Sequence, residues 1–170
     1  MVDPSDLPAD LVASIDAYRF RGTAAKVNFA LSGLPKFPGL GDRENIFDGF
    51  TNIGPSINYL EEAFTDSQAG RFSRRPFIDC CLQSLIDPDL SPPGKHVMSC
   101  FVMYCPSQLS NSDWDSEKTP LGDTVQETLE EFFPGFSELV IHREVVTPKD
   151  IQSRTGLSQG DIFAGQLFSS

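Results

Sequence analysis

The sequence predicts one α+β domain over residues 1–170, with a mixed, largely antiparallel sheet and helices packed on it. Three observations predict this fold. Segments with the two-residue period of strands are interspersed with segments of helical period, which is the pattern of a layered domain. Two of the strand segments are separated only by a short loop, which favours an antiparallel pair. Finally, 39% hydrophobic and 22% charged residues are typical of a globular chain, and this length fits a single domain.

Two short elements open the chain. A helix is predicted over about residues 8–18, where apolar residues recur at helical spacing: Leu11, Ile15 and Tyr18. Residues 24–31 alternate apolar and polar side chains, which predicts a half-exposed strand. Residues 32–55 are rich in Gly and Pro and are predicted to form a long loop, whose aromatic residues favour a packed conformation.

The middle of the chain predicts a helix and a strand pair. Ser56 is expected to cap a helix that runs to about Ala69, with Ile57, Leu60 and Phe64 on its inner face. Strands are predicted over 77–86 and 95–104. The second has apolar residues on both faces, which indicates a central strand covered on both sides.

The last third predicts two helices and two strands. Thr119–Pro120 is expected to open a helix that ends at Pro134–Gly135. Its apolar stripe comprises five residues: Leu121, Val125, Leu129, Phe132 and Phe133. A strand over 139–146 follows, then a short helix from Thr147 to Gly156 with capping residues at its start, and a final strand over 160–168.

Charge argues against several partners. The chain has 13 Lys and Arg against 24 Asp and Glu, a net charge of −11, so it lacks the basic surface that nucleic acids require. Its densest basic cluster, Arg71, Arg74 and Arg75, is short. No apolar run approaches the roughly 20 residues of a membrane span, and the acidic N-terminus resembles no targeting signal. An intracellular protein without a transmembrane segment is therefore expected.

The cysteines and histidines predict no metal site. Cys80, Cys81, Cys100 and Cys105 show no Cys-x-x-Cys spacing, and the two histidines complete no zinc signature. Buried free thiols are expected. A cross-strand Cys81–Cys100 disulfide is conceivable if 77–86 and 95–104 form a hairpin, but an intracellular location disfavours it.

Motifs for catalysis and nucleotide binding are missing. Gly39–Leu40–Gly41 has no third glycine at the required spacing, and Pro93–Gly94–Lys95 lacks the rest of a phosphate loop. No Gly-x-Ser-x-Gly sequence is present, and His96 and His142 fall within strand patterns, where a structural role is expected. The sequence thus predicts no catalytic residue in this chain.

Lys26 and Asn28 are the best candidates for a binding site. They share the face of strand 24–31 that is opposite to its apolar residues. This face is either solvated or lines a ligand cavity, in which the two polar side chains would point inward among small residues.

Several segments together resemble one family, the phytoene-desaturase-like FAD-dependent oxidoreductases, and within it the pyridine nucleotide-disulphide oxidoreductase domain-containing branch. These segments are 22–31, 92–101, Trp114–Asp115, 133–136, 147–150 and 160–163. The resemblance spans about Phe20 to Leu167 and corresponds to the middle region of the family, its substrate domain. It implies a mixed sheet flanked by helices that lies over the flavin.

The resemblance implies a substrate-binding domain of a larger flavoprotein that acts on an apolar substrate. The Gly-rich flavin-binding segments of the family have no counterpart in this sequence, so FAD is expected in the parent protein and not tightly bound to this chain. We expect Lys26, Asn28, His96 and Tyr104 to face the substrate. The expected partner is the remainder of the flavoprotein, or a second copy through the same docking face. The expected location is cytoplasmic, or mitochondrial in a eukaryote.

Two other interpretations remain open. A stand-alone α+β module that binds a lipid-like ligand or a protein partner fits a folded chain without catalytic motifs. A hydrolase using His96 or His142 would need a nucleophile beside one of these histidines, and the sequence points to none.

Overall fold

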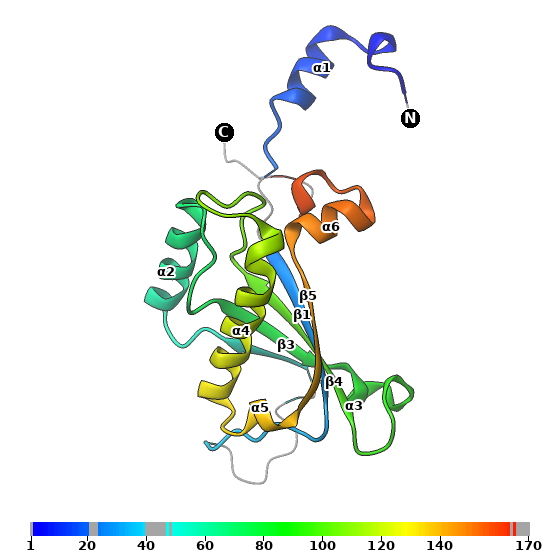
Figure 1. Cartoon of the computed structure of the whole chain (residues 1–170). Helices are drawn as coiled ribbons and strands as arrows, with labels where there is room; N and C mark the ends of the chain where they lie inside the picture. Colours follow the sequence, from blue (N-terminus) through cyan, green and yellow to red (C-terminus); the bar gives the residue numbers. More distant parts are fainter. Residues whose placement is uncertain (1, 21–23, 40–46, 48, 164, 166–170) are drawn as a thin grey trace.

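The computed structural model describes residues 2–20, 24–39, 47, 49–163 and 165, which form the predicted α+β fold (Figure 1). The strands are β1 (Ala24–Leu31), β2 (Phe50–Ile53), β3 (Phe77–Leu82), β4 (His96–Met103) and β5 (Val140–Val146). They form a five-stranded sheet in the order β2-β3-β4-β1-β5. Every strand pairing in the described residues is antiparallel, including the predicted pair β3–β4.

The described residues also form six helices. They are α1 (Ala9–Asp16), α2 (Ile57–Gln68), α3 (Gln83–Ile86), α4 (Trp114–Phe132), α5 (Phe136–Leu139) and α6 (Pro148–Thr155). Short 3₁₀ turns span Pro4–Asp6, Pro88–Leu90 and Ser158–Gly160. The long helix α4 lies across the sheet, whereas α1 projects away from the body of the molecule (Figure 1). No helix in the described ranges is long and apolar enough to cross a bilayer.

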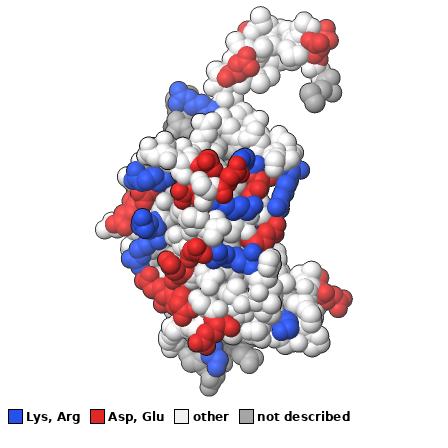
Figure 2. Space-filling view, viewed as in Figure 1, with Lys and Arg blue, Asp and Glu red and all other residues white. Residues whose placement is uncertain are grey.

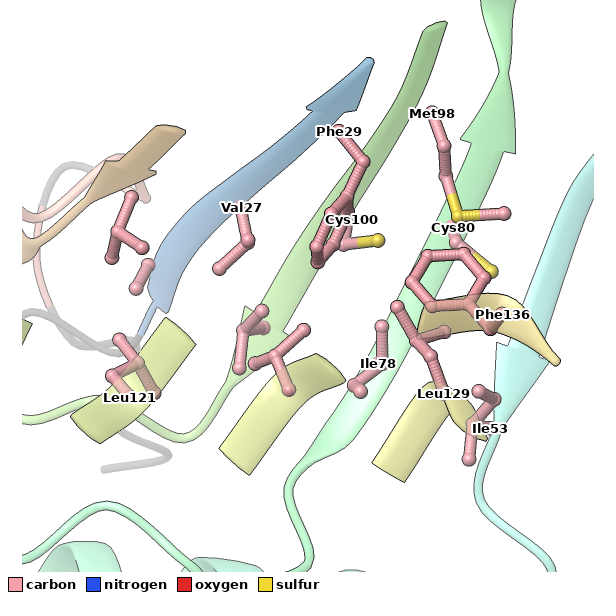
Figure 3. Packing of buried hydrophobic residues seen from close by; sticks show 14 of the residues in the cluster. Val27, Phe29, Ile53, Ile78, Cys80, Met98, Cys100, Leu121, Leu129 and Phe136 are labelled. Carbon is pink, nitrogen blue, oxygen red and sulfur yellow. The ribbon is translucent and has the colours of Figure 1, made fainter. Parts of the chain in front are cut away.

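The core lies between the sheet and α4. The central strands contribute Val27, Phe29, Met98, Cys100 and Val102, all fully buried (Figure 3). From the helical side, buried Leu121, Val125 and Leu129 of α4 and Phe136 of α5 pack on them. The rings of Phe29 and Phe136 meet edge to face with their centroids 5.1 Å apart. We call this side of the sheet the covered face.

The opposite side is defined by the residues that alternate with these in each strand. We call it the open face. It comprises Phe50 and Asn52 of β2, Phe77, Asp79 and Cys81 of β3, Val97, Ser99, Phe101 and Met103 of β4, Ala24, Lys26, Asn28 and Ala30 of β1, and His142, Glu144 and Val146 of β5. Its larger apolar side chains are half-buried or exposed, and Lys26 is exposed. The prediction that 95–104 is central is therefore confirmed, but its covering on both faces is wrong.

Helix ends differ from the predictions where a polar cap competes with proline. The helix predicted to start at Thr119–Pro120 starts at Trp114, because the Asp113 carboxylate accepts the N–H groups of Asp115 and Ser116. Pro120 lies inside α4. The helix predicted from Thr147 is confirmed as α6. Its capping box joins Thr147 and Asp150, and Gly156 ends it at φ 76°.

The predicted inner face of α2 is also wrong. The structure buries Tyr59 and Ala63, while Ile57 and Phe64 are exposed and Leu60 is half-buried. The Tyr59 hydroxyl donates to the carbonyl oxygen of Pro76 at 2.9 Å, so the helix turns its tyrosine inward. The helix predicted over 8–18 ends at Asp16 as α1, so Tyr18 lies beyond it, and Leu11, Ile15 and Tyr18 are all exposed.

The remaining differences concern strands and cysteines. The predicted strand 77–86 ends at Leu82 and continues as α3, and the predicted loop 32–55 contains β2. Part of that loop, 40–46 and 48, lies outside the described residues. So do 164 and 166–168 of the predicted last strand, whose described start is a 3₁₀ turn. All four cysteines are buried and free, as expected, but Cys100 pairs in register with Cys80 and not with Cys81.

Candidate functional site

A ladder of hydrogen bonds crosses the open face. Ser99, Asn28 and Glu144 lie opposite one another on β4, β1 and β5. The Ser99 hydroxyl donates to Asn28 Oδ1 at 2.9 Å, and Asn28 Nδ2 donates to Glu144 Oε2 at 3.3 Å. Arg154 of α6 donates to the other oxygen of Glu144 at 3.1 Å. These contacts fix the orientation of the Asn28 amide on the sheet.

The charge of the ladder follows from its contacts. Hydrogen bonds from Arg154 and from Asn28 lower the pKa of Glu144 below its usual value. Glu144 is thus a carboxylate at neutral pH, already neutralised by Arg154. The polar groups of the ladder are therefore hydrogen-bonded and ordered. The Glu144–Arg154 ion pair adds no net charge to the open face.

The next row of the open face is more apolar. Asp79, Phe101, Lys26 and Val146 lie side by side on β3, β4, β1 and β5. The half-buried Phe101 ring meets the ring of Phe163 edge to face, with centroids 6.3 Å apart. Lys26 makes no ion pair within the part of the chain that the structure describes. An unpaired cation thus lies between two apolar side chains.

Asp79 is the least satisfied polar group of this face. Its Oδ1 atom is buried and has no hydrogen-bond partner among the described residues. Burial raises the pKa of this carboxyl above its usual value. A buried carboxylate oxygen without a hydrogen-bond partner is costly, which makes Asp79 a candidate for contact with a ligand or partner.

The structure brings together two of the four residues predicted to face the substrate. Lys26 and Asn28 are neighbours on the open face. His96 lies at the start of β4, where its Nδ1 is 3.2 Å from the Ser84 hydroxyl, and burial lowers its pKa. Tyr104 follows the end of β4, and its ring centroid lies 5.4 Å from that of Phe64 of α2. His96 and Tyr104 therefore do not join Lys26 on this face.

The Ser84–His96 contact bears on the hydrolase interpretation. Ser84 Oγ also accepts the N–H of Val97 at 3.1 Å, and the serine is buried. Both contacts hold the start of β4 against α3, which is a structural role. His142 is exposed on β5.

Sequence reasoning missed Asp79, Ser99, Phe101 and Glu144 as members of this face. One signal was present, since Asp79 is a lone acid within the apolar strand 77–82. The others required the register between strands, which brings residues distant in the sequence into one row.

The described residues do not fit a flavin cradle. A dinucleotide cradle needs a strand that enters a Gly-rich turn and a helix within a parallel βαβ unit. Every described strand pairing here is antiparallel, and residues 40 and 41 of the Gly39–Leu40–Gly41 sequence lie outside the described ranges. The described residues also hold no group of three potential metal ligands.

No protein-family model matches the chain. It is 33% identical over 170 residues to pyridine nucleotide-disulfide oxidoreductase domain-containing protein 2 of Rattus norvegicus, and 33% identical over 172 residues to that of Mus musculus. Each match covers 95% of this chain and 29% of the relative. The chain thus spans less than a third of the length of the curated relatives it matches. The resemblance to pyridine nucleotide-disulphide oxidoreductase domain-containing proteins is confirmed over nearly the whole chain.

Proposed function

We propose that this chain is the substrate-binding part of an FAD-dependent oxidoreductase of the phytoene dehydrogenase-like family, acting on an apolar substrate. The observation that carries the proposal is the open face. It presents Val97, Phe101 and Met103 half-buried on a central strand, where a purely solvated face would carry polar residues. The match to one segment of much longer oxidoreductase-domain proteins supports it.

The open face would bind and orient the substrate. Phe101, Val97 and Met103 offer apolar contact, while Lys26 and Asn28 supply polar groups beside it. Asn28 is held by Ser99 and Glu144 and needs no reorientation when a ligand binds. The face is part of a rigid sheet, which suits a surface that must place one bond of a substrate accurately.

The redox chemistry would belong to FAD held by the remainder of a longer protein. That remainder would cover the open face, exclude water and enclose the substrate between the two parts. We assign this chain alone no turnover and no tight flavin binding. Cytoplasmic location, or mitochondrial location in a eukaryote, belongs to the same proposal.

Binding of retinol, an apolar polyene with its own fluorescence, tests the open face directly. Phe101→Ser should weaken retinol binding to the chain about tenfold, because it removes the half-buried aromatic ring of the central strand β4. Leu11→Ser on the projecting helix α1 is the matched control and should leave binding unchanged. Equal affinity of Phe101→Ser and the unaltered chain would refute the assignment of this face.

The flavin assignment has a separate test. Equilibrium dialysis of the chain against FAD should leave no stoichiometric flavin after exchange into flavin-free buffer. Retention of one tightly bound FAD per chain would contradict it. Sedimentation should also show self-association that Phe101→Ser reduces, since the exposed face lacks its partner. Self-association unaffected by this substitution would place the contact elsewhere.

A further inference from the structure

A hollow lies on the helical side, between α2 and the first half of α4. It has a volume of about 950 Å³, and the turn 70–75 and the loop 109–112 contribute to its lining. The proposed function above does not use it. Its size falls within the range of sites for small molecules and short peptides.

The hollow has a fixed apolar floor. Phe72 and Leu109 are the half-buried apolar side chains of the lining, and behind them Phe72 stacks on the buried Trp114 with ring centroids 6.0 Å apart and an interplanar angle of 23°. The turn and the loop are joined at Gly70, whose carbonyl oxygen accepts the N–H of Ser110 at 2.9 Å. At φ 72°, a Cβ on Gly70 would approach Ser110 Oγ to 1.9 Å, so this contact depends on glycine. Contacts within the chain thus hold Phe72 and the turn that carries it in place.

Two of the three arginines beside the hollow are already neutralised. Arg71 pairs with Asp66 at 2.8 Å. Arg75 pairs with Glu131 at 2.6 Å, and its guanidinium carbon lies 5.2 Å from the centre of the Tyr59 ring. These pairs hold the turn 70–75 against α2 and α4. They leave Arg74, the third arginine of the turn, without an ion-pair partner among the residues that the structure describes.

The remaining charges on the lining are of both signs. Arg74 on the turn and Glu61 and Glu62 on α2 have no hydrogen-bond or ion-pair partner in the described ranges. A further carboxylate, Glu117 of α4, accepts a hydrogen bond from the Ser112 hydroxyl at 2.8 Å. Figure 2 shows acidic and basic side chains interspersed over this helical side. The hollow thus combines an unpaired guanidinium and unpaired carboxylates around an aromatic floor.

We propose that this hollow binds a short zwitterionic peptide with an apolar side chain. Its ammonium end would pair with Glu61 and Glu62, its carboxylate with Arg74, and its apolar side chain would rest on Phe72. A purely anionic ligand would be repelled by the glutamates, and a purely cationic one by Arg74. A ligand with both charges and an apolar centre satisfies all three features.

Titration calorimetry with the tripeptide Leu-Phe-Leu tests the proposal on the full chain. The peptide with free ends should bind more tightly than its N-acetylated form and than its C-terminal amide, by about three- to fivefold each. Arg74→Gln should weaken binding of the free peptide by the same factor and leave the affinity of the amide unchanged. The double variant Glu61→Gln with Glu62→Gln should lower the affinity for the free peptide and not for the acetylated one.

Controls separate this pattern from general charge effects. Lys36→Gln and Glu138→Gln change exposed charges outside the hollow and should leave all three affinities unchanged. L-Phenylalanine carries the same ammonium, carboxylate and apolar groups in a single amino acid. Its affinity, compared with that of the tripeptide, shows whether the hollow takes an amino acid or a peptide. Absence of tripeptide binding at millimolar concentration, or equal affinities for free and blocked peptides, would overturn the proposal. Circular dichroism should show that Arg74→Gln folds normally, since Arg74 has no partner to lose. These outcomes do not depend on the open face or on flavin.

Discussion

The two faces of the sheet use the same strands in opposite ways. On β4, Met98, Cys100 and Val102 are fully buried against the helices, while Val97, Phe101 and Met103 of the same strand are half-buried on the open face. The covered face therefore supplies most of the stability of the fold through burial of apolar area. The open face holds comparable side chains without a cover, and its polar groups are ordered by mutual hydrogen bonds. This comparison separates residues that the fold needs from residues that remain available to a ligand or partner.

The largest expected effect is the difference in stability between two variants, each of which removes a phenylalanine from one face. Phe29→Ala should lower the free energy of unfolding by about 3–5 kcal/mol, because Phe29 is fully buried against Phe136. Phe101→Ala should cost less than about 1.5 kcal/mol, because the ring is half-exposed already. Urea denaturation of both variants checks this. Equal losses would show that the open face is as much a part of the core as the covered face.

A smaller effect is expected where α4 approaches β5. A Cβ on Gly122 would lie 2.7 Å from Arg143 Nε and 2.8 Å from Val145 Cγ2, so Gly122→Ala must push the helix away from the covered face. We expect a net loss of about 1–2 kcal/mol, since the better helix propensity of alanine offsets part of the overpacking. Glu127→Ala, on the exposed side of α4, is the control for thermal denaturation. A stabilised Gly122→Ala variant would mean that the helix packs less closely.

The capping box of α6 allows a test by pH. Burial alone would raise the pKa of Asp150, but hydrogen bonds from Lys118 and Thr147 outweigh it and lower the pKa. A lowered folded-state pKa means that this stabilisation is present above about pH 4 and is lost as pH falls through the folded value. Asp150→Asn should cost about 1 kcal/mol at pH 7, and less as the pH is lowered toward 3. A loss of unfolding free energy that does not depend on pH would rule out the Lys118–Asp150 ion pair as its cause. Asp10→Asn on α1 is the control.

The smallest effect concerns Asp79 on the open face and has the opposite sign. Burial raises the pKa of this carboxyl, so its ionised form destabilises the native state above the folded value, and protonation relieves the cost as pH falls. Asp79→Asn should raise the free energy of unfolding at pH 7 by less than about 0.5 kcal/mol, because partial exposure screens the charge. The gain should shrink as the pH falls through the raised folded pKa toward about 4, the ordinary value of an aspartate, as followed by thermal melts. Destabilisation by Asp79→Asn at pH 7 would show that the carboxylate has a structural partner.

Local patterns in the sequence determined several features of this protein. The alternation in residues 24–31 specified β1 to the residue and placed Lys26 and Asn28 opposite the core. Ser56 and the Thr147–Asp150 box specified where α2 and α6 begin, because capping satisfies backbone N–H groups within one helical turn. The resemblance to the oxidoreductase-domain proteins was also readable from the sequence, since it depends on the order of motifs.

Only the tertiary structure decided the rest. The burial of Tyr59 in place of Ile57 depends on a hydrogen bond to Pro76, and the ending of β3 at Leu82 depends on the packing of α3 against β4. The ladder from Ser99 to Glu144 requires the register of three strands, and the hollow beside Arg74 requires two helices and two loops to meet. The physical reason is the same in each case. Periodicity and caps act within a few residues of the chain, whereas rows on a sheet, floors of hollows and uncovered faces are made by contacts between residues far apart in sequence.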